Sequence, residues 1–218
     1  SFITKTYLHL CGAILAFIAC EAVLLNLPGI QNIVQMMMSS WFLVILAFMA
    51  AAWVAERWAQ SDASQPMQYL GLGLYVLIEA VICLPLIWMA ANFGAPVEVA
   101  GSSLGVIPAA AATTLILFGG LTAIVFVTRR DFSFLRGIVV FGFLAVMVTI
   151  VASMIFGFHL GLFFMIAVAA LACTTILYQT SNVLHHYYVG QHVAASLALF
   201  ASVSTLFDYI LMICMSRD

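Results

Sequence analysis

The stretch "FLRGIVVFGFLAVMVTIVASMIF", from Phe134 to Phe156, decides the fold class of this chain. It contains a single charged residue, Arg136, near its beginning, and its polar and apolar positions do not alternate. A helix needs about 20 consecutive apolar residues to cross a bilayer core, whereas a strand of a membrane barrel needs about 9 to 11 with alternating character. The stretch therefore predicts a membrane-spanning helix and excludes a barrel strand.

The rest of the 218-residue chain repeats this pattern. Hydrophobic residues make up 66% of it and charged residues 6%, against about 25% charged in a soluble domain, and the mean hydropathy is +1.22. Six further apolar runs are long enough to span a membrane: Thr6 to Leu27, Met38 to Val54, Met67 to Phe93, Val106 to Val127, Leu160 to Leu184 and Val193 to Met215. The first run is too long for a cleaved signal peptide and is counted as a span. We expect an all-α fold, one domain over 1–218, built as a bundle of seven transmembrane helices.

The positive charges predict the orientation of the bundle. If the N-terminus is cytoplasmic, Arg217 alone lies on the opposite side, and the remaining basic residues share the cytoplasmic side: Lys5, Arg57, Arg129, Arg130 and Arg136. Because cytoplasmic loops carry the excess of Lys and Arg, we expect a cytoplasmic N-terminus and a C-terminus on the other side. The net charge of −2 and the lack of a basic patch exclude nucleic acid as a partner.

Cysteines and histidines raise the question of a metal site or an enzyme. The five cysteines are odd in number and fall inside apolar runs, which predicts small core residues rather than a disulfide framework. None of His185, His186 and His192 forms the i, i+4 pair of a helical zinc site. We therefore expect interfacial histidines, no metal, no cofactor and no enzyme. An intramembrane zinc hydrolase is the disfavoured alternative, because we expect neither a usable metal triad nor a nucleophile motif such as GxSxG.

Three acidic residues fall inside predicted spans. Glu79 lies about midway along the third span, Glu21 lies in the second half of the first, and Asp208 lies toward the end of the seventh. Acidic side chains are costly at this depth, by at least about 2.5 kcal/mol, and usually face a bundle interior or a cavity. Two interpretations remain open: a protonated structural group that is hydrogen-bonded to a neighbouring helix, or part of an ion or proton path.

Polar residues also gather at the end of the sixth span. Thr175, Gln179, Asn182 and His186 are spaced by four, three and four residues, which places them on one helix face. A turn around Gly190 sends the seventh span back alongside, so Gln179 and Ser202 are expected at nearly the same depth. Ser202 and Thr205 continue the polar face there. Arg57, at the cytoplasmic end of the second span, could either snorkel to water or reach inward to this seam. The polar groups either hold the helices together, at about 0.6 kcal/mol per bond, or serve a function.

The residues as a set resemble the Bax inhibitor-1/YccA family of membrane proteins, also called the TMBIM family, and the bacterial branch in particular. The resemblance covers essentially the whole chain. It rests on seven spans and on four segments: "TKTYLHLCGAILAF", "AERW", "ILYQTSNVLHH" and "ALFASVSTLFDYIL".

The resemblance also implies a site, and this chain departs from it. In the family pattern two aspartates pair across the sixth and seventh spans as a proton-sensitive site, and an arginine near the inner end of the second span acts as a latch. Laid on this sequence, "ILYQT" places Gln179 at the first aspartate and "LFASVSTLF" places Ser202 at the second, while Arg57 matches the latch. An amide and a hydroxyl do not titrate near neutral pH and bring no charge to calcium, unlike a coupled pair of carboxylates.

Two functions follow as expectations from the resemblance. The first is a calcium or other cation leak channel whose diacid pH sensor is altered or absent. The second is a membrane regulator without transport that binds an FtsH-type membrane protease, and the loss of both aspartates favours it. Both imply an integral protein of the bacterial inner membrane, with the lipid bilayer as a partner.

Overall fold

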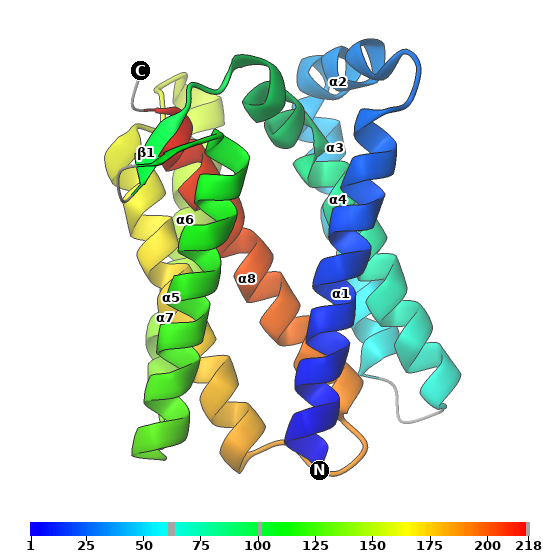
Figure 1. The fold of residues 1–218 in the computed structure, drawn as a ribbon, viewed down its shortest axis with the longest axis vertical. Coiled ribbons are helices and arrows are strands. Elements are labelled where there is room, and N and C mark those ends of the chain that lie inside the picture. Colours follow the sequence, from blue (N-terminus) through cyan, green and yellow to red (C-terminus); the bar gives the residue numbers. More distant parts are fainter. Residues whose placement is uncertain (61–63, 100–101, 217–218) are drawn as a thin grey trace. The chain divides into compact units, whose positions relative to one another are not determined.

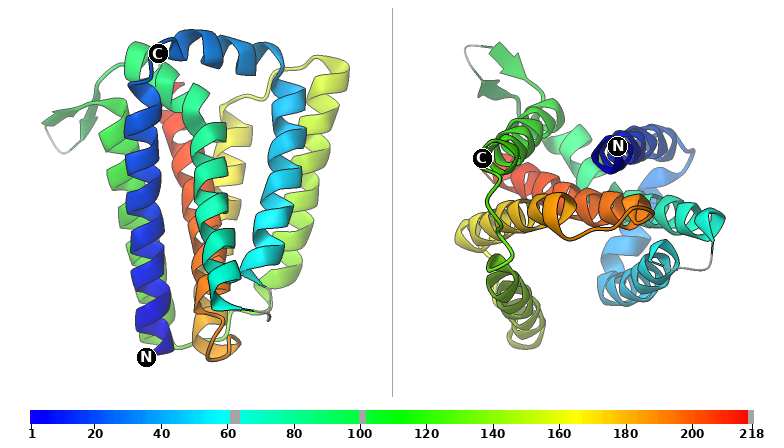
Figure 2. Two further views of the ribbon diagram at one scale, coloured as in Figure 1. Left: turned by 90° about the vertical axis from the view of Figure 1, so that its right-hand side faces the viewer. Right: turned by 90° about the horizontal axis from the view of Figure 1, so that it is seen from below.

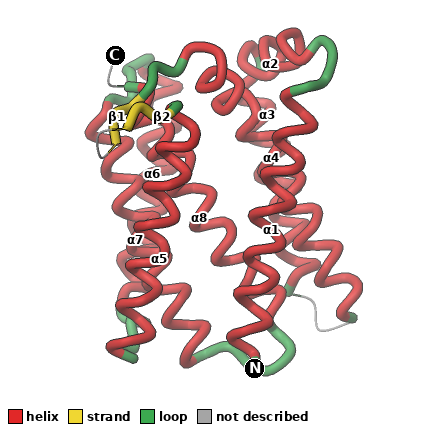
Figure 3. The backbone as a smooth tube through the Cα atoms, viewed as in Figure 1, coloured by secondary structure: helices red, strands yellow, loops and turns green. Residues whose placement is uncertain are grey.

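Helices make up almost all of the regular structure. The computed structural model describes residues 1–60, 64–99 and 102–216, and within them the chain forms eight α-helices and a pair of short strands (Figure 1). The backbone coloured by secondary structure in Figure 3 shows how small the strand content is. The predicted all-α class is confirmed. Arg217, the basic residue predicted to lie on the side of the membrane opposite to the N-terminus, is outside the described residues.

Among the described residues, seven helices are long and apolar enough to cross a membrane, as predicted. They are α1 (Phe2–Leu25), α3 (Trp41–Ala59), α4 (Gln65–Phe93), α5 (Val106–Thr128), α6 (Leu135–Phe156), α7 (Leu162–His185) and α8 (His192–Met215). For six of them the predicted ends fall within a few residues of the observed ones. The accuracy reflects the length and uniform apolarity of the runs.

The second span is the exception, because the sequence prediction missed a helix before it. The segment expected to be a loop and the start of a span forms α2 (Ile30–Ser39), and the span begins only at Trp41 and continues past Arg57 to Ala59. α2 lies across the ends of α1 and α3 at a steep angle to both (Figure 2, left). Ile30, Val34 and Met37 form its buried face at helical spacing. A short amphipathic helix of this kind is easily mistaken for a loop.

The strands were also not predicted. β1 (Val97–Val99) and β2 (Ser102–Leu104) pair antiparallel in a segment that the sequence indicated as a loop, with Val97 opposite Leu104 and Glu98 opposite Ser103. Three-residue strands are too short to show the alternation by which a strand is recognised in sequence.

The described chain divides into two compact units. The first consists of Ser1–Asn92 and Tyr187–Phe200, which contain α1 to α4 and the beginning of α8. The second consists of Phe93–His186 and Ala201–Asp218, which contain the two strands, α5, α6, α7 and the rest of α8. We describe each unit by itself.

In the first unit, α3 and α4 approach closely at Gly71. A Cβ built on Gly71 would lie 2.6 Å from the carbonyl oxygen of Ala55 and closer still to the amide nitrogen of Ala59. Glycine is therefore required there for the two backbones to approach. Phe200 joins the same unit through edge-to-face contacts with Phe17 and Tyr75, at ring-centroid distances of 6.0 and 6.2 Å.

In the second unit, α7 packs against both α5 and α6. A Cβ built on Gly142 of α6 would lie 2.6 Å from Cδ1 of Leu171, so the leucine side chain covers this glycine. Near the other end of α7, the ring of Phe164 meets Tyr209 of α8 edge to face at 6.4 Å. The second unit therefore contains α7 and the part of α8 that carries Ser202 and Thr205.

Candidate functional site

The predicted seam residues occupy different environments in the second unit. Gln179 is half-buried on α7, whereas Ser202 is buried on α8 with 7% of its surface exposed. Asn182 is half-buried, and its backbone carbonyl accepts the N–H of His186 at the end of α7. The direct pairing of Gln179 with Ser202 stays a prediction.

The two threonines of the predicted polar face bond to their own helices. The hydroxyl of Thr175 donates to the carbonyl of Leu171 at 2.9 Å, and that of Thr205 donates to the carbonyl of Ala201 at 2.8 Å. A hydroxyl in a membrane span satisfies its donor in this way when no better acceptor is near. These side chains make the face polar. Each of these two hydrogen bonds stays within its own helix.

The intramembrane acids lie inside the protein. Glu21 on α1 and Glu79 on α4 each expose only 5% of their surface, and both belong to the first unit. The thiol of Cys83, one turn after Glu79, lies 3.9 Å from its Oε1 and donates to it. Neither carboxylate oxygen of Glu21 has a hydrogen-bond partner among the described residues. Asp208 is half-buried in the second unit.

Arg57, the predicted latch, lies on an exposed position of α3. Its guanidinium carbon stands 4.8 Å from the ring centroid of Trp53, one turn earlier, in a cation–π arrangement. The contact holds the arginine along the surface of its own helix in this structure. A role as a latch stays a prediction.

A polar cluster that the sequence did not reveal joins the α5–α6 connection to α7. The hydroxyl of Ser181 accepts the N–H of Phe132 at 2.8 Å and donates to Oδ1 of Asp131 at 3.3 Å. Nε2 of His186 lies 3.4 Å from Oδ2 of Asp131. The backbone N–H of Ser133 holds the pKa of the Asp131 carboxyl below its usual value, and His186 acts in the same direction. His186 thus faces a carboxylate at the helix end.

A second unpredicted cluster lies in the first unit, at the beginning of α1. The ring of His9 stacks on Tyr69 with centroids 5.3 Å apart and lies 5.0 Å from the ring of His192. The hydroxyl of Tyr69 lies 3.3 Å from Nε2 of His192, and Ser196 donates from the next turn of α8 to the carbonyl of Thr6 at 2.8 Å. Because each of these contacts between helices joins residues more than 50 positions apart, no local pattern could bring them together.

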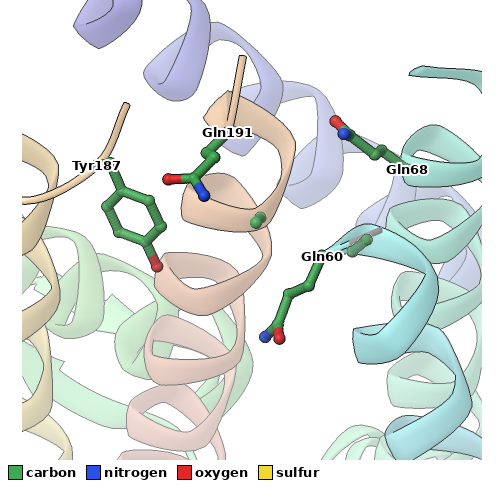
Figure 4. A pocket seen from close by; sticks show the side chains of 6 residues that line it. Gln60, Gln68, Tyr187 and Gln191 are labelled. Atoms are coloured by element: carbon green, nitrogen blue, oxygen red, sulfur yellow. The ribbon is translucent and has the colours of Figure 1, made fainter. Parts of the chain in front are cut away.

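A small polar pocket of about 320 Å³ also lies in the first unit. Figure 4 shows Tyr187 and Gln191, from the segment that leads into α8, on one side and Gln60 and Gln68 on the other. Oε1 of Gln191 accepts the N–H of Tyr188 at 3.1 Å. The four labelled side chains carry amides and a phenol and no formal charge, so the pocket suits a neutral polar group.

The histidines considered for a metal are engaged in separate contacts. His185 Nδ1 lies 3.1 Å from the carbonyl of Ser181, His186 faces Asp131, and His192 meets Tyr69 and His9. A carbonyl can only accept, so Nδ1 of His185 is a donor here. All five cysteines carry free thiols.

A short motif that also occurs in hydrolases lies directly before α5. The segment 101–105 reads "GSSLG", which has the GxSxG spacing of a hydrolase nucleophile turn, although the sequence expectation was that no nucleophile motif is present. Ser103 lies within β2, opposite Glu98, and Gly101 lies outside the described residues. The nucleophile of such enzymes sits on a sharp turn between a strand and a helix, so the position of Ser103 within the strand does not match that arrangement.

Comparison with known proteins places this geometry in a family. The family model described as "Inhibitor of apoptosis-promoting Bax1" matches residues 1–218. The chain is also similar to "Uncharacterized protein PA2604" of Pseudomonas aeruginosa, with 34% identity over 111 residues, which is 50% of this chain and 49% of that protein. The match therefore spans about half the length of this curated relative.

Proposed function

The chain belongs to the Bax inhibitor-1 family of integral membrane proteins, and from this premise we propose that it is a non-enzymatic cation leak protein of a bacterial inner membrane. Calcium is the cation that the family resemblance favours. The similarity to a Pseudomonas protein supports the bacterial membrane. The lipid bilayer is the immediate partner in this proposal.

The burial of carboxyl groups within two spans is the observation that carries the proposal. Glu21 and Glu79 are each 5% exposed in membrane-spanning helices, and Glu21 has no hydrogen-bond partner among the described residues. A buried acid without compensation is costly in a membrane and usually marks an ion or proton path. Carboxylate oxygens are also the ligands that calcium prefers.

The leak we propose lacks the diacid pH sensor of the family pattern. Gln179 and Ser202 stand where the resemblance places two aspartates, and an amide and a hydroxyl cannot share a titrating proton. Weak calcium binding at this seam and conduction that changes little around neutral pH follow from that chemistry.

The absence of both aspartates from the seam supports a second candidate function. A protein that has lost both seam carboxylates could act without transport, as a regulator that binds an FtsH-type membrane protease. The regulator predicts no cation flux at any pH and a stable complex with a membrane protease. Flux measurements separate it from the leak protein.

The test is calcium flux into proteoliposomes that contain the purified chain, at about pH 6 and about pH 8, which bracket the range of histidine titration. We expect flux at both values and a decrease of about an order of magnitude in Glu79→Gln, which corresponds to about 1.4 kcal/mol of lost cation stabilisation. Glu21→Gln should act in the same direction. Glu98→Gln is the matched control, because it makes the same change at an exposed residue of β1.

A gain-of-function arm tests the seam. Converting Gln179 and Ser202 together to aspartate should add a pH dependence to the flux, because two close carboxylates titrate as a coupled pair. If folded protein gave no flux at either pH, the leak would be excluded and the regulator would become the better proposal. Flux that was unchanged by both Glu79→Gln and Glu21→Gln would remove the acids from the path.

A further inference from the structure

The first unit carries a groove between α1 and α4 that the proposed leak does not use. The hollow has a volume of about 550 Å³ and an almost entirely apolar lining. Ala13, Leu72 and Val76 are its buried lining residues, and the exposed side chains of Leu8 and Leu77 flank them. Both helices are membrane spans, so an apolar ligand of the bilayer can reach an open groove along them.

Two glycines keep the groove open. A Cβ built on Gly12 or on Gly73 meets no atom within 4 Å, and both residues line the hollow. Gly71, two residues before Gly73 on α4, differs because it is pressed against the α3 backbone. The glycine at position 73 therefore does not serve helix packing within the structure, and its missing side chain leaves room for something else.

The length of the groove matches one leaflet of a bilayer. Along α1 it runs from Leu8 to Cys20, a distance of about 18 Å at the helical rise of 1.5 Å per residue. Half of a hydrocarbon core of about 30 Å is about 15 Å. One extended acyl chain fills such a length.

Polar and basic groups stand at the end of the groove nearer the N-terminus of α1. His9 and Tyr69 line the groove there, and His192 contacts both. Nδ1 of His9 donates to the carbonyl of Lys5 at 2.6 Å. Nε2 is therefore the ring nitrogen through which His9 can contact a ligand. Lys5 is exposed one turn before His9 and continues the face of α1 that lines the groove, through positions 5, 9, 12, 16 and 20.

We propose that this groove is a binding site for one anionic phospholipid, with an acyl chain between α1 and α4 and the phosphate beside Lys5, His9 and Tyr69. A polar end joined to a leaflet-long apolar groove has the shape and the charge of half a lipid molecule. The basic side chains at the end favour a negatively charged headgroup over a zwitterionic one. Conduction is not needed for this site, and its test does not depend on the leak.

A helix from a second copy is the competing occupant, since glycine-lined surfaces also bind helices. A symmetric dimer through this face would bring Lys5 and His9 of one chain toward the same residues of the other. Such an arrangement places like charges together, whereas a phosphate neutralises them.

The experiment is native mass spectrometry of the full-length chain released from vesicles that contain equal amounts of phosphatidylglycerol and phosphatidylcholine. We expect one retained lipid per chain, and we expect phosphatidylglycerol to be strongly preferred. Gly73→Leu fills the groove and should weaken retention about tenfold. Leucine is a better helix former than glycine and meets no clash at Cβ, so the variant should fold.

Two further variants separate the parts of the site. Gly119→Leu makes the same change on α5, where a Cβ also meets nothing within 4 Å, and should leave lipid retention unchanged. Lys5→Gln leaves the groove open but should abolish the preference for phosphatidylglycerol. Retention by Gly73→Leu equal to that of the unaltered chain would overturn the site, as would equal retention of both lipids. A lipid-free dimer that Gly73→Leu dissociates would assign the groove to a second copy instead.

Discussion

α4 and α6 are both long apolar helices, yet the protein uses them in opposite ways. In the most apolar stretch of α4, 56% of the residues are buried, whereas α6 is described over its whole length and has no buried residue. Both pass the test of length and composition for a membrane span. Hydropathy therefore identifies a span without saying how much of it faces protein.

The difference lies in small and polar residues. α4 places Gly71 against the backbone of α3 and buries Glu79 and Cys83 one turn apart. α6 consists mostly of large apolar side chains, and its contact at Gly142 is covered by a single leucine from α7. In a membrane, lipid is as apolar as leucine, so close approach and polar groups rather than apolarity decide which face packs.

The largest effect should come from adding a methyl group to the α3–α4 contact. Gly71→Ala forces the new Cβ into the backbone of Ala55 and Ala59, which cannot rotate away, so the free energy of unfolding should fall by about 1 to 3 kcal/mol. Unfolding in mixed micelles, titrated with sodium dodecyl sulfate and followed by circular dichroism, measures it.

Two glycines of α6 are the controls for that change. Gly137→Ala meets nothing within 4 Å and should change stability by no more than about 0.5 kcal/mol. Gly142→Ala should fall between the two, because its clash is with the movable side chain of Leu171. Equal losses at positions 71 and 137 would show that burial does not distinguish the two helices.

A smaller effect is expected at the connection before α6, which is tied to α7 by Asp131 and Ser181. A carboxyl whose pKa is lowered on folding stabilises the folded state above its unfolded pKa, and that contribution is lost as the pH falls through the folded pKa. Asp131→Asn should therefore lower stability at neutral pH, and the difference from the unaltered chain should shrink below about pH 4. Chemical unfolding across this pH range measures both.

Ser181→Ala supplies the control for this contact. If Asp131 acts through Ser181, the double variant should lose less stability than the two single losses added together. Additive losses would mean that the carboxyl acts through the Ser133 N–H and His186 alone.

The smallest effect should come from a hydroxyl within α6. Thr149 donates to the carbonyl of Ala145 in its own helix at 2.7 Å, so Thr149→Val removes a local bond and leaves the carbonyl in its helical bond. We expect a change of no more than about 0.5 kcal/mol in the same unfolding assay. A loss above about 1 kcal/mol would reveal a partner for the hydroxyl outside α6.

The candidate site could be predicted only in part. The acids Glu21 and Glu79 stand out in sequence because charge within an apolar run is rare, and the structure finds both buried. The placement of Thr175 and Thr205 on a seam stays a prediction, and their hydroxyls donate to carbonyls of their own helices. The cluster of His9, Tyr69 and His192 had no sequence signal, because its members come from three separate helices.

The sequence by itself determined the seven spans, because a bilayer imposes a minimum apolar length that a single chain displays openly. It did not determine α2, because a short amphipathic helix between two spans is easily taken for a loop. Nor did it determine the hairpin of three-residue strands. Only the tertiary structure decided which glycine packs and which leaves a groove. Gly71 and Gly73 lie two residues apart in one helix, and what separates them is the neighbouring α3 backbone, which lies beside one and not the other.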